Sequence, residues 1–527
     1  MPKKVPLKVQ KPSGFNLSFQ NILTSKPGTI TPLLCHELIP NSKVDLKATI
    51  QASLPPLAFD TFMRCALKVQ AFFVPMRILV GSFEDFFTNQ FRDADGTTYY
   101  PILPLIQADE LTAGHVFDPG TLADYLGFKS DFVAPESFQL SMMPFLAYHR
   151  IYEDWFRNTK LQRSIYEYDA QSSAFSSIGV SHLPYIFPNI LEGNYVYDMQ
   201  FSYPDSFLFA DGHNLFDLRQ CNFEDDYFTI ATPNVSDKDV VISTPSDKFS
   251  IGALRGGNAL QIYADRHNIA GPRYVDRLRS DYNAHLSEGV AQRCILLGSQ
   301  EFEVYSKGIY SQSPAAQGSQ VNNPFDSVGA RYGDAYAAGN GSLAHFTAEE
   351  PGYLMVVCEL VPRVTYGTGV DRKFLRYLGE GSITDMANPI LQGIGNQPIF
   401  ERELNGNLGS ESVFGYTERF ADWKTKCDEL HGLVRDGQSL QAMVLQRTFA
   451  GTDDPRIGND FIQIPTDYLD QITAVTAAVS NYGYWLDSFF DFKVVMPLAP
   501  YSIPTLEDVS SEHNDTVLVR PGGQRIP

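Results

Sequence analysis

The sequence lacks the features that mark membrane proteins, secreted disulfide proteins and zinc proteins. No apolar run reaches the roughly 18 residues of a bilayer-spanning helix, and residues 1–20 lack the continuous apolar segment of a signal peptide. The six cysteines are scattered, and Cys65, Cys294 and Cys358 lie inside apolar runs, which predicts buried free thiols. We therefore expect a protein made and kept in the cytoplasm, without a disulfide framework or a CxxC metal site.

The motifs that most catalytic sites require are missing as well. The ten histidines occur singly, without an HExxH or HxH pair, and there is no GxSxG nucleophile motif. The Gly-rich stretch 252–260 lacks the GxxxxGK[ST] spacing of a phosphate-binding loop. The segments DGHN, 211–214, and FEDDY, 223–227, contain one and three carboxylates and could hold a cation, although solvated acidic loops are far commoner. We expect neither an enzyme nor a bound cofactor or metal.

Charge is scarce and unevenly distributed along the chain. Charged residues make up 19% of the 527 residues, aromatic residues make up 13%, and the net charge is −20. No acidic residue precedes Glu37, so residues 1–36 carry +5, which leaves −25 on the rest of the chain. This asymmetry predicts a basic arm on an acidic body, which either contacts a polyanion or only aids solubility. The five positive charges are Lys3, Lys4, Lys8, Lys11 and Lys26.

What the sequence does contain is period-two alternation at widely separated places. In residues 43–53, five apolar side chains alternate with polar ones, which predicts a strand with one buried face. Residues 65–74 show the same pattern, and the strand should end at Pro75 because proline has no N–H for a ladder. Further strands are predicted at 294–305, 353–366 and 489–498.

Helical spacing is clearest at 145–156, where four aromatic residues recur at i, i+3, i+7 and i+10. A short helix is also predicted to begin at 82–87, and a longer helical region at 258–286 is broken by Gly271-Pro272. Residues 313–341 are rich in Gly, Ala, Ser and Asn, which predicts a loop.

These patterns predict a mainly β fold in which a few strands from distant segments come together. We expect a single viral jelly roll, an eight-stranded antiparallel β-sandwich, with long loop and helix insertions. Residues 1–36 would form the basic N-terminal arm and residues 37–527 one jelly-roll domain. The large insertions would occupy about 76–293 and 313–488.

Several segments resemble motifs of a known family, both in amino-acid sequence and in their order along the chain. The segment LSMMPFLAYHRIYEDWFRNTKLQ, 140–162, resembles a signature of microvirus major capsid proteins. The segments DDYFTIATP, 225–233, and FGYTERFADWK, 414–424, are similar to two further motifs of that family. Other matching segments are 35–51, 67–79, 258–278 and 348–372. The chain thus resembles the major capsid proteins of the Microviridae, of the gokushovirus-like kind, across residues 35 to about 500.

The resemblance implies a major capsid protein that forms the icosahedral shell of a small, non-enveloped, single-stranded DNA bacteriophage. About sixty copies would build each shell by symmetry. The implied partners are packaged circular single-stranded DNA, a small basic DNA-binding protein, pilot or spike-type minor virion proteins and a host cell-surface receptor. The protein would be found in the virion after assembly in the cytoplasm of the bacterial host. The five arm lysines would then contact DNA phosphates, or the arm would tie neighbouring subunits together.

Two other classes of protein stay open from the residues alone. One is a secreted carbohydrate-binding or surface-layer β protein, against which the lack of a signal peptide counts. The other is a glycosidase, which is suggested only by the abundance of carboxylates and aromatic residues.

Overall fold

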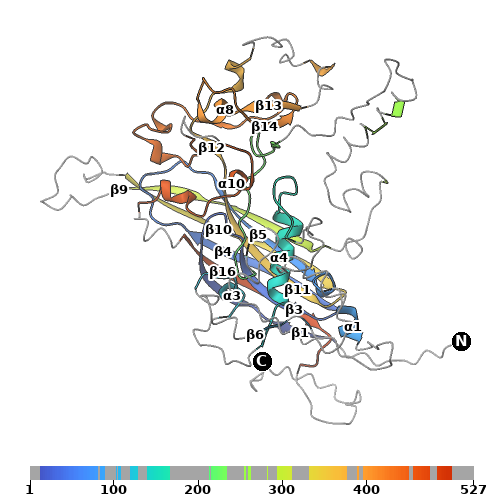
Figure 1. Cartoon of the computed structure of the whole chain (residues 1–527). Coiled ribbons are helices and arrows are strands. Elements are labelled where there is room, and N and C mark those ends of the chain that lie inside the picture. The colour runs from blue at the N-terminus through green and yellow to red at the C-terminus, as the bar shows by residue number, and fades with distance from the viewer. Residues whose placement is uncertain are drawn as a thin grey trace, which may run out of the picture.

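Two antiparallel β-sheets packed face to face form the body of the protein, as a computed structural model shows (Figure 1). The larger sheet has six strands in the described part of the chain, and the smaller sheet has four. The structure describes residues 12–80, 83–88, 105–107, 119–128, 139–165, 215–233, 293–310, 331–376, 388–390, 396–449, 455–474 and 483–500, together with the single or paired residues 103, 213, 255–256, 259–260, 262 and 282.

The larger sheet contains β1 (Ser13–Asn16), β2 (Phe19–Ser25), β4 (Ser42–Ser53), β9 (Tyr305–Tyr310), β10 (Arg331–Ala348) and β16 (Tyr484–Met496). Strand β16 lies beside β4, and its other edge pairs with β2 and then β1. Strand β10 pairs with β4 on one side and with β9 on the other.

The smaller sheet contains β3 (Thr31–Leu38), β5 (Cys65–Pro75), β8 (Ile295–Glu303) and β11 (Gly352–Pro362), in the spatial order β3-β11-β5-β8. The corresponding order in the larger sheet is β2-β16-β4-β10. Eight strands distributed in this way over two sheets form a jelly roll, so the predicted fold class is confirmed.

Alternation along the strands builds the core between the sheets. The buried side chains of β4 are those that the period-two pattern predicts: Val44, Leu46, Ala48, Ile50 and Ala52 are each at most 1% exposed. The intervening side chains of β4 point out of the sandwich. Strand β5 ends at Pro75 as expected, and the strand predicted at 489–498 begins earlier, at Tyr484. The predicted free thiols are confirmed, since Cys65, Cys294 and Cys358 are buried and unbridged.

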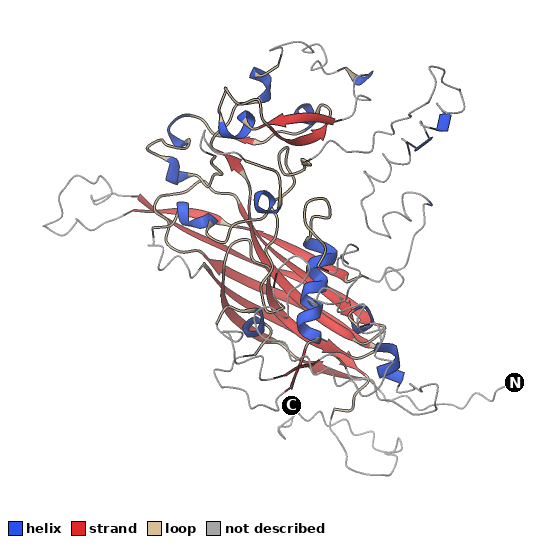
Figure 2. Ribbon diagram, in the orientation of Figure 1, coloured by secondary structure: helices blue, strands red, loops and turns tan. Residues whose placement is uncertain are grey.

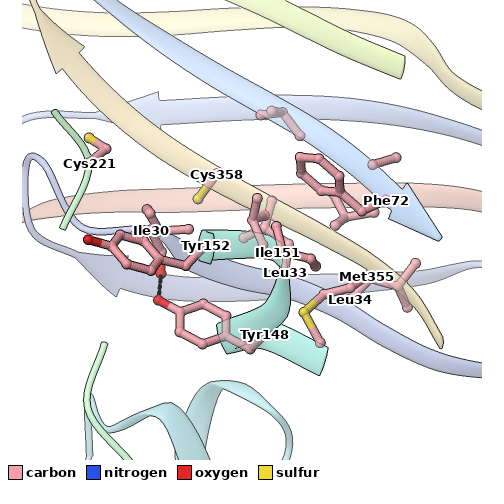
Figure 3. Packing of buried hydrophobic residues seen from close by; sticks show 14 of the residues in the cluster. Ile30, Leu33, Leu34, Phe72, Tyr148, Ile151, Tyr152, Cys221, Met355 and Cys358 are labelled. Carbon is pink, nitrogen blue, oxygen red and sulfur yellow. Dashed lines mark hydrogen bonds between the residues drawn. The ribbon is translucent and has the colours of Figure 1, made fainter. Parts of the chain in front are cut away.

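Helix α4 (Met143–Ile151), continued by a π-helical turn η2 (Tyr152–Phe156), covers the outer face of the smaller sheet (Figure 2). The hydroxyl of Tyr148 donates a hydrogen bond to the carbonyl of Ile30 at 2.7 Å (Figure 3). Trp155 is only partly buried, with its ring centroid 5.8 Å from that of Phe72, and its indole N–H donates to the carbonyl of Cys294 at 3.0 Å. The predicted helix is therefore confirmed, and its aromatic stripe is used for packing.

Strand β10 contradicts the loop predicted at 313–341, because residues 331–341 form its first half. Ala335 and Ala337 are fully buried in the alternating pattern of a strand. A side chain added to Gly339 would collide with the ring of Phe302 on β8, in the opposite sheet. Small residues are needed here because the two sheets approach closely, which a composition-based loop prediction overlooks. Residues 311–330 lie outside the described residues.

Two long connections interrupt the jelly roll. The first, between β5 and β8, spans residues 76–294, close to the predicted insertion at about 76–293. The second, between β11 and β16, spans residues 363–483. The predicted bounds of about 313–488 are too wide, because that range also contains β10 and β11. The division of the chain into one arm and one domain stays a prediction, although β1, β2 and β3 of the predicted arm pair within the sheets.

Short elements occupy the connections. In the first connection these are η1 (Met76–Ile78), α1 (Phe83–Thr88), β6 (Leu105–Gln107), α3 (Leu122–Tyr125) and β7 (Gln139–Ser141). In the second they are β12 (Thr365–Tyr366), η6 (Arg372–Phe374), β13 (Asn396–Phe400), α8 (Arg402–Asn405), β14 (Val413–Glu418), α9 (Ala421–Lys424), β15 (Asp428–Glu429), η9 (Gly432–Val434), η10 (Gln441–Met443), α10 (Asn459–Ile462) and η11 (Tyr468–Gln471).

Some predictions cannot be compared with the structure. The helical region predicted at 258–286 lies almost entirely outside the described residues, whereas the helix expected at 82–87 is present as α1. Among the helices that the structure describes, none has both the length and the apolar character needed to cross a membrane.

Candidate functional site: an insertion module and an exposed sheet face

Only one of the five lysines predicted to contact nucleic acid lies in the described part of the chain. Lys26 is exposed and follows the end of β2, whereas Lys3, Lys4, Lys8 and Lys11 lie outside the described residues. Because β1 to β3 are strands of the two sheets, a free arm would be shorter than predicted. A contact between these lysines and DNA stays a prediction.

The two long connections meet in a second, smaller body, which we call the insertion module and define as residues 225–233 and 365–462. Its elements β13, β14 and α8 lie beyond one end of the sheets (Figure 1). Three of the motifs behind the family resemblance converge here, namely 225–233, the end of 348–372, and 414–424. The buried apolar cluster of the module consists of Tyr227, Phe228, Ala231, Ile399, Leu404, Phe414, Ala421, Ile457, Phe461 and Ile462.

Asp226 organises the turn that begins the module. One oxygen of its carboxylate accepts hydrogen bonds from the backbone N–H groups of Phe228 and Thr229, at 2.9 and 2.8 Å. The other oxygen accepts from the hydroxyl of Tyr366 at 2.7 Å, and burial together with this carboxylate raises the pKa of Tyr366. Both carboxylate oxygens of Asp226 thus accept hydrogen bonds that hold the turn, and neither is left over as a ligand for a cation. Over the described ranges, no three His, Cys, Asp or Glu side chains are grouped as metal ligands.

A buried ion pair lies at the centre of the module. The carboxylate of Glu403 lies 3.0 Å from the guanidinium of Arg372 and accepts the N–H of Phe400 at 3.0 Å. The hydroxyl of Tyr227 donates to its other oxygen at 3.2 Å. Burial raises the pKa of Glu403, although Arg372 opposes this effect. Every oxygen of the carboxylate therefore has a partner, which is the condition under which a buried charge is tolerated.

Arg447 lies among four aromatic rings. Its guanidinium carbon is 4.2 Å from the ring centroid of Phe461, 4.6 Å from Phe223, 5.5 Å from Phe449 and 5.9 Å from Tyr366. The guanidinium also donates to the carbonyl of Phe461 at 2.8 Å. The cation is held both by ring faces and by a backbone acceptor. Sequence reasoning missed this residue because no local motif marks it and two of its ring partners, Phe223 and Tyr366, come from distant segments.

A cavity of about 540 Å³ opens on the module. Its wall includes the thiol of Cys427, whose pKa burial raises to about 12, so the thiolate needed for nucleophilic attack is disfavoured. Charged residues of both signs line the cavity in nearly equal numbers, which favours neither an anionic nor a cationic ligand. They are Asp371, Arg372, Lys373, Glu403, Asp422, Lys426, Asp428, Glu429 and Arg435.

Amide side chains connect the helical signature at 140–162 to a later part of the first connection and to the second connection. The side-chain nitrogen of Gln162 donates to Asn222 at 3.0 Å and to Asn459 at 2.8 Å. Its oxygen accepts the backbone N–H of Asn158 at 2.7 Å. Gln162 is buried, so these bonds replace water for its whole amide group. Gln162, the last residue of the signature, thus holds α10 of the module against the segment that follows helix α4.

The larger sheet turns an aromatic face to solvent. Strand register places Trp485 opposite Ser53, Ser53 opposite Tyr336, and Tyr336 opposite Tyr305, in one row across four strands. The three aromatic side chains are 45%, 45% and 57% exposed, respectively. No sequence prediction singled out this row, because it depends on the register of strands that are distant in the chain.

Comparison with known proteins identifies the family. Residues 4–506 match the family described as capsid protein (F protein). The chain belongs to this capsid protein family. It is also similar to the capsid protein VP1 of Chlamydia phage 1, with 23% identity over 96% of this chain and 97% of the relative. The capsid proteins VP1 of Bdellovibrio phage phiMH2K and Spiroplasma virus 4 are 25% and 23% identical and cover 93% and 94% of this chain, and 95% and 96% of their own lengths.

The predicted resemblance to microvirus capsid proteins is therefore confirmed. The protein is a phage major capsid protein, and its place is the virion. Family membership gives the insertion module and the exposed aromatic face a shared explanation, because a capsid protein must assemble with copies of itself. The module and the exposed aromatic face are then candidate assembly surfaces.

Proposed function

We propose that about sixty copies of this protein form a closed icosahedral shell around the circular single-stranded DNA genome of a small bacteriophage. The protein has a structural and not a catalytic role in this proposal. The single observation that carries it is the jelly-roll sandwich, which extends from β2 to β16 within a match to the capsid family over residues 4–506. The sandwich supplies a rigid wall, and the long connections supply adaptable surface for contacts between copies.

The surface composition supports assembly into a larger particle. Large apolar side chains are exposed on the module as well as on the sheet, among them Phe374 at 68% and Trp423 at 57%. Aromatic side chains are enriched where proteins meet, because they bury much area with little loss of conformational freedom. A protein that worked alone would leave this surface in water at a cost in solubility.

The proposed partners inside and on the particle follow from charge and from the phage context. Residues 37–527 carry −25, which opposes contact with DNA. We therefore assign the DNA contact to Lys3, Lys4, Lys8, Lys11 and Lys26, with a separate small basic protein to neutralise most of the genome. Pilot or spike-type minor virion proteins and a host cell-surface receptor complete the proposed partners, and assembly takes place in the bacterial cytoplasm.

Electron microscopy of the protein expressed in bacteria tests the shell. We expect closed particles about 25–30 nm across, from the bulk of roughly sixty subunits of this size. Sedimentation of the same sample should give one fast, homogeneous boundary. Monomers or open sheets at every concentration, salt and temperature tried would contradict the proposal.

Removal of residues 2–12 tests the assignment of the DNA contact. We expect shells that assemble but contain little DNA, measured from the ratio of absorbance at 260 and 280 nm. A matched variant that replaces Lys3, Lys4, Lys8 and Lys11 by glutamine keeps the length of the arm and should lose DNA in the same way. A full DNA complement in both variants would refute the contact, and failure of only the truncated protein to assemble would show that the arm ties subunits together.

A further inference from the structure

The outer face of the larger sheet carries both aromatic and charged side chains. Its aromatic part, which we call the aromatic patch, is centred on the row of Tyr305, Tyr336 and Trp485. The chain neighbours of Tyr336 and Trp485 are buried in the sandwich core, and Val304 before Tyr305 is buried too, so the three rings point away from the core. Phe489 and Ile22 extend the patch along β16 and β2, at 47% and 71% exposure.

The charges on this face balance, unlike those of the whole chain. Its strands carry four exposed lysines and four partly exposed aspartates that point to the same side as the aromatic patch. The face is therefore neutral by count, whereas the chain carries −20. These residues are Lys43, Lys47, Lys307, Lys493, Asp45, Asp334, Asp487 and Asp491.

This balance decides between two occupants of the patch. A single strand of DNA stacks its bases on aromatic rings, but it also requires a positive groove along its phosphates. The four aspartates on this face cancel the positive charge that such a groove would need. Two copies of the chain repel each other through their net negative charge, and this repulsion is weakest where a neutral face is buried. Charge therefore favours a second copy over a nucleic acid.

The edge of the sheet next to the patch is also open to a neighbour. Within the described residues, β9 pairs with β10 alone, and the two strands together reach beyond β4 (Figure 1). An exposed edge strand with apolar side chains readily associates with another chain unless it is covered. Tyr305 and Ile309 of β9 are both at least half exposed.

We propose that a second copy of this chain covers the aromatic patch in the assembled shell, with Tyr305, Tyr336 and Trp485 as the buried anchors of that contact. The inference rests on the proposed shell and specifies one of its interfaces. Aromatic anchors at the centre of an interface typically carry most of its binding energy. The lysines and aspartates around the patch then form the rim, where they set the register between copies.

The first experiment removes two anchors without touching the core. In the double variant Tyr305→Ser and Tyr336→Ser, the unassembled subunit should melt at the wild-type temperature, since both side chains are exposed. Assembly, followed by sedimentation and electron microscopy, should require a subunit concentration at least about tenfold higher. The control is Thr347→Ala, at an exposed position opposite Lys43 on the same face and outside the patch, which should assemble as wild type.

Normal assembly of the double variant would overturn the inference while leaving the proposed shell intact. Failure of the wild-type protein to form shells under any condition would overturn both. Normal assembly of the double variant with a reduced DNA content would show that nucleic acid, and not a second copy, covers the patch.

The second experiment needs no variant, so it holds even if the double variant misfolds. Tyrosines of wild-type shells and of dissociated subunits are nitrated, and the modified residues are identified by mass spectrometry. We expect modification of Tyr305 and Tyr336 to fall at least about fivefold on assembly, in empty and in filled shells alike. Equal modification in shells and subunits, or protection in filled shells only, would refute a contact between copies.

Discussion

The jelly-roll sandwich and the insertion module belong to one chain but are stabilised in different ways. The sandwich buries long rows of apolar side chains contributed by eight strands, and Phe490 at its centre is fully buried. The buried apolar cluster of the module has ten residues in its described part, and the module adds the buried pair of Arg372 and Glu403 and the ring-bound Arg447. A small body cannot bury enough apolar surface to be stable by packing alone.

The difference shows what each region contributes to a capsid protein. Apolar packing in the sandwich depends on volume, so ionisation should change its stability at few positions, of which buried Glu359 is one. Charged and aromatic contacts in the module depend on the exact partners, so a single substitution should disturb it locally. We therefore expect a substitution in one region to destabilise that region and to leave the other region folded.

The largest effect is expected from Phe490→Ala, which breaks the sandwich. The ring of Phe490 packs 5.3 Å from that of Phe19, and its removal leaves a cavity in the core. We expect the free energy of unfolding of the unassembled subunit to fall by about 3–5 kcal/mol in chemical denaturation. The control Phe489→Ala, one residue away on the exposed face, should cost less than about 1 kcal/mol. Equal losses from both variants would mean that the two faces are misassigned.

Glu403→Ala should break the module and spare the sandwich. The substitution leaves the buried guanidinium of Arg372 without its carboxylate, which costs about 3–5 kcal/mol locally. Amide hydrogen exchange should accelerate in β13 and α8 and stay unchanged in β4 and β16. The exposed pair of Glu418 and Lys424 provides a control, since Glu418→Ala should change exchange little. Faster exchange throughout both sheets would contradict the separation of the two regions.

Arg447→Lys sharpens the comparison, because it keeps the charge and removes the planar group. The lysine cannot lie flat among four rings while donating to the carbonyl of Phe461. We expect a loss of about 1–2 kcal/mol from the module, again measured by hydrogen exchange. Arg435→Lys, at an exposed position, should have no effect. Unchanged hydrogen exchange in the Arg447→Lys variant would show that the positive charge alone stabilises the module at this position.

Glu359→Gln in the sandwich should stabilise the protein instead of destabilising it, and its effect should disappear at low pH. Glu359 is buried on β11 opposite Lys68, and burial raises its pKa to about 7. The unfolded state ionises first as the pH rises, so the wild-type protein should lose stability between about pH 5 and pH 7. Glutamine removes this cost, with an expected gain of about 1–3 kcal/mol at pH 8 and none at pH 4. Parallel stability curves for the two proteins would refute the raised pKa.

The sequence predicted the strands better than it predicted the surfaces. Alternation located the buried face of β4 and the end of β5, and aromatic spacing located α4. It failed at β10, where alanine and glycine occupy the buried positions because the facing sheet is close. Family resemblance supplied the capsid function, which no single residue pattern indicates.

What the sequence by itself determined is which side of each strand is buried, since that information repeats every two residues and needs no distant partner. What only the tertiary structure decided is which distant segments share a site. Arg447 meets Phe223 and Tyr366, and Trp485 lies in a row with Tyr305, across separations of more than 80 residues in each case. Such contacts form only when strand pairing closes long loops, and the entropy of loop closure depends on the whole chain rather than on the residues at either end.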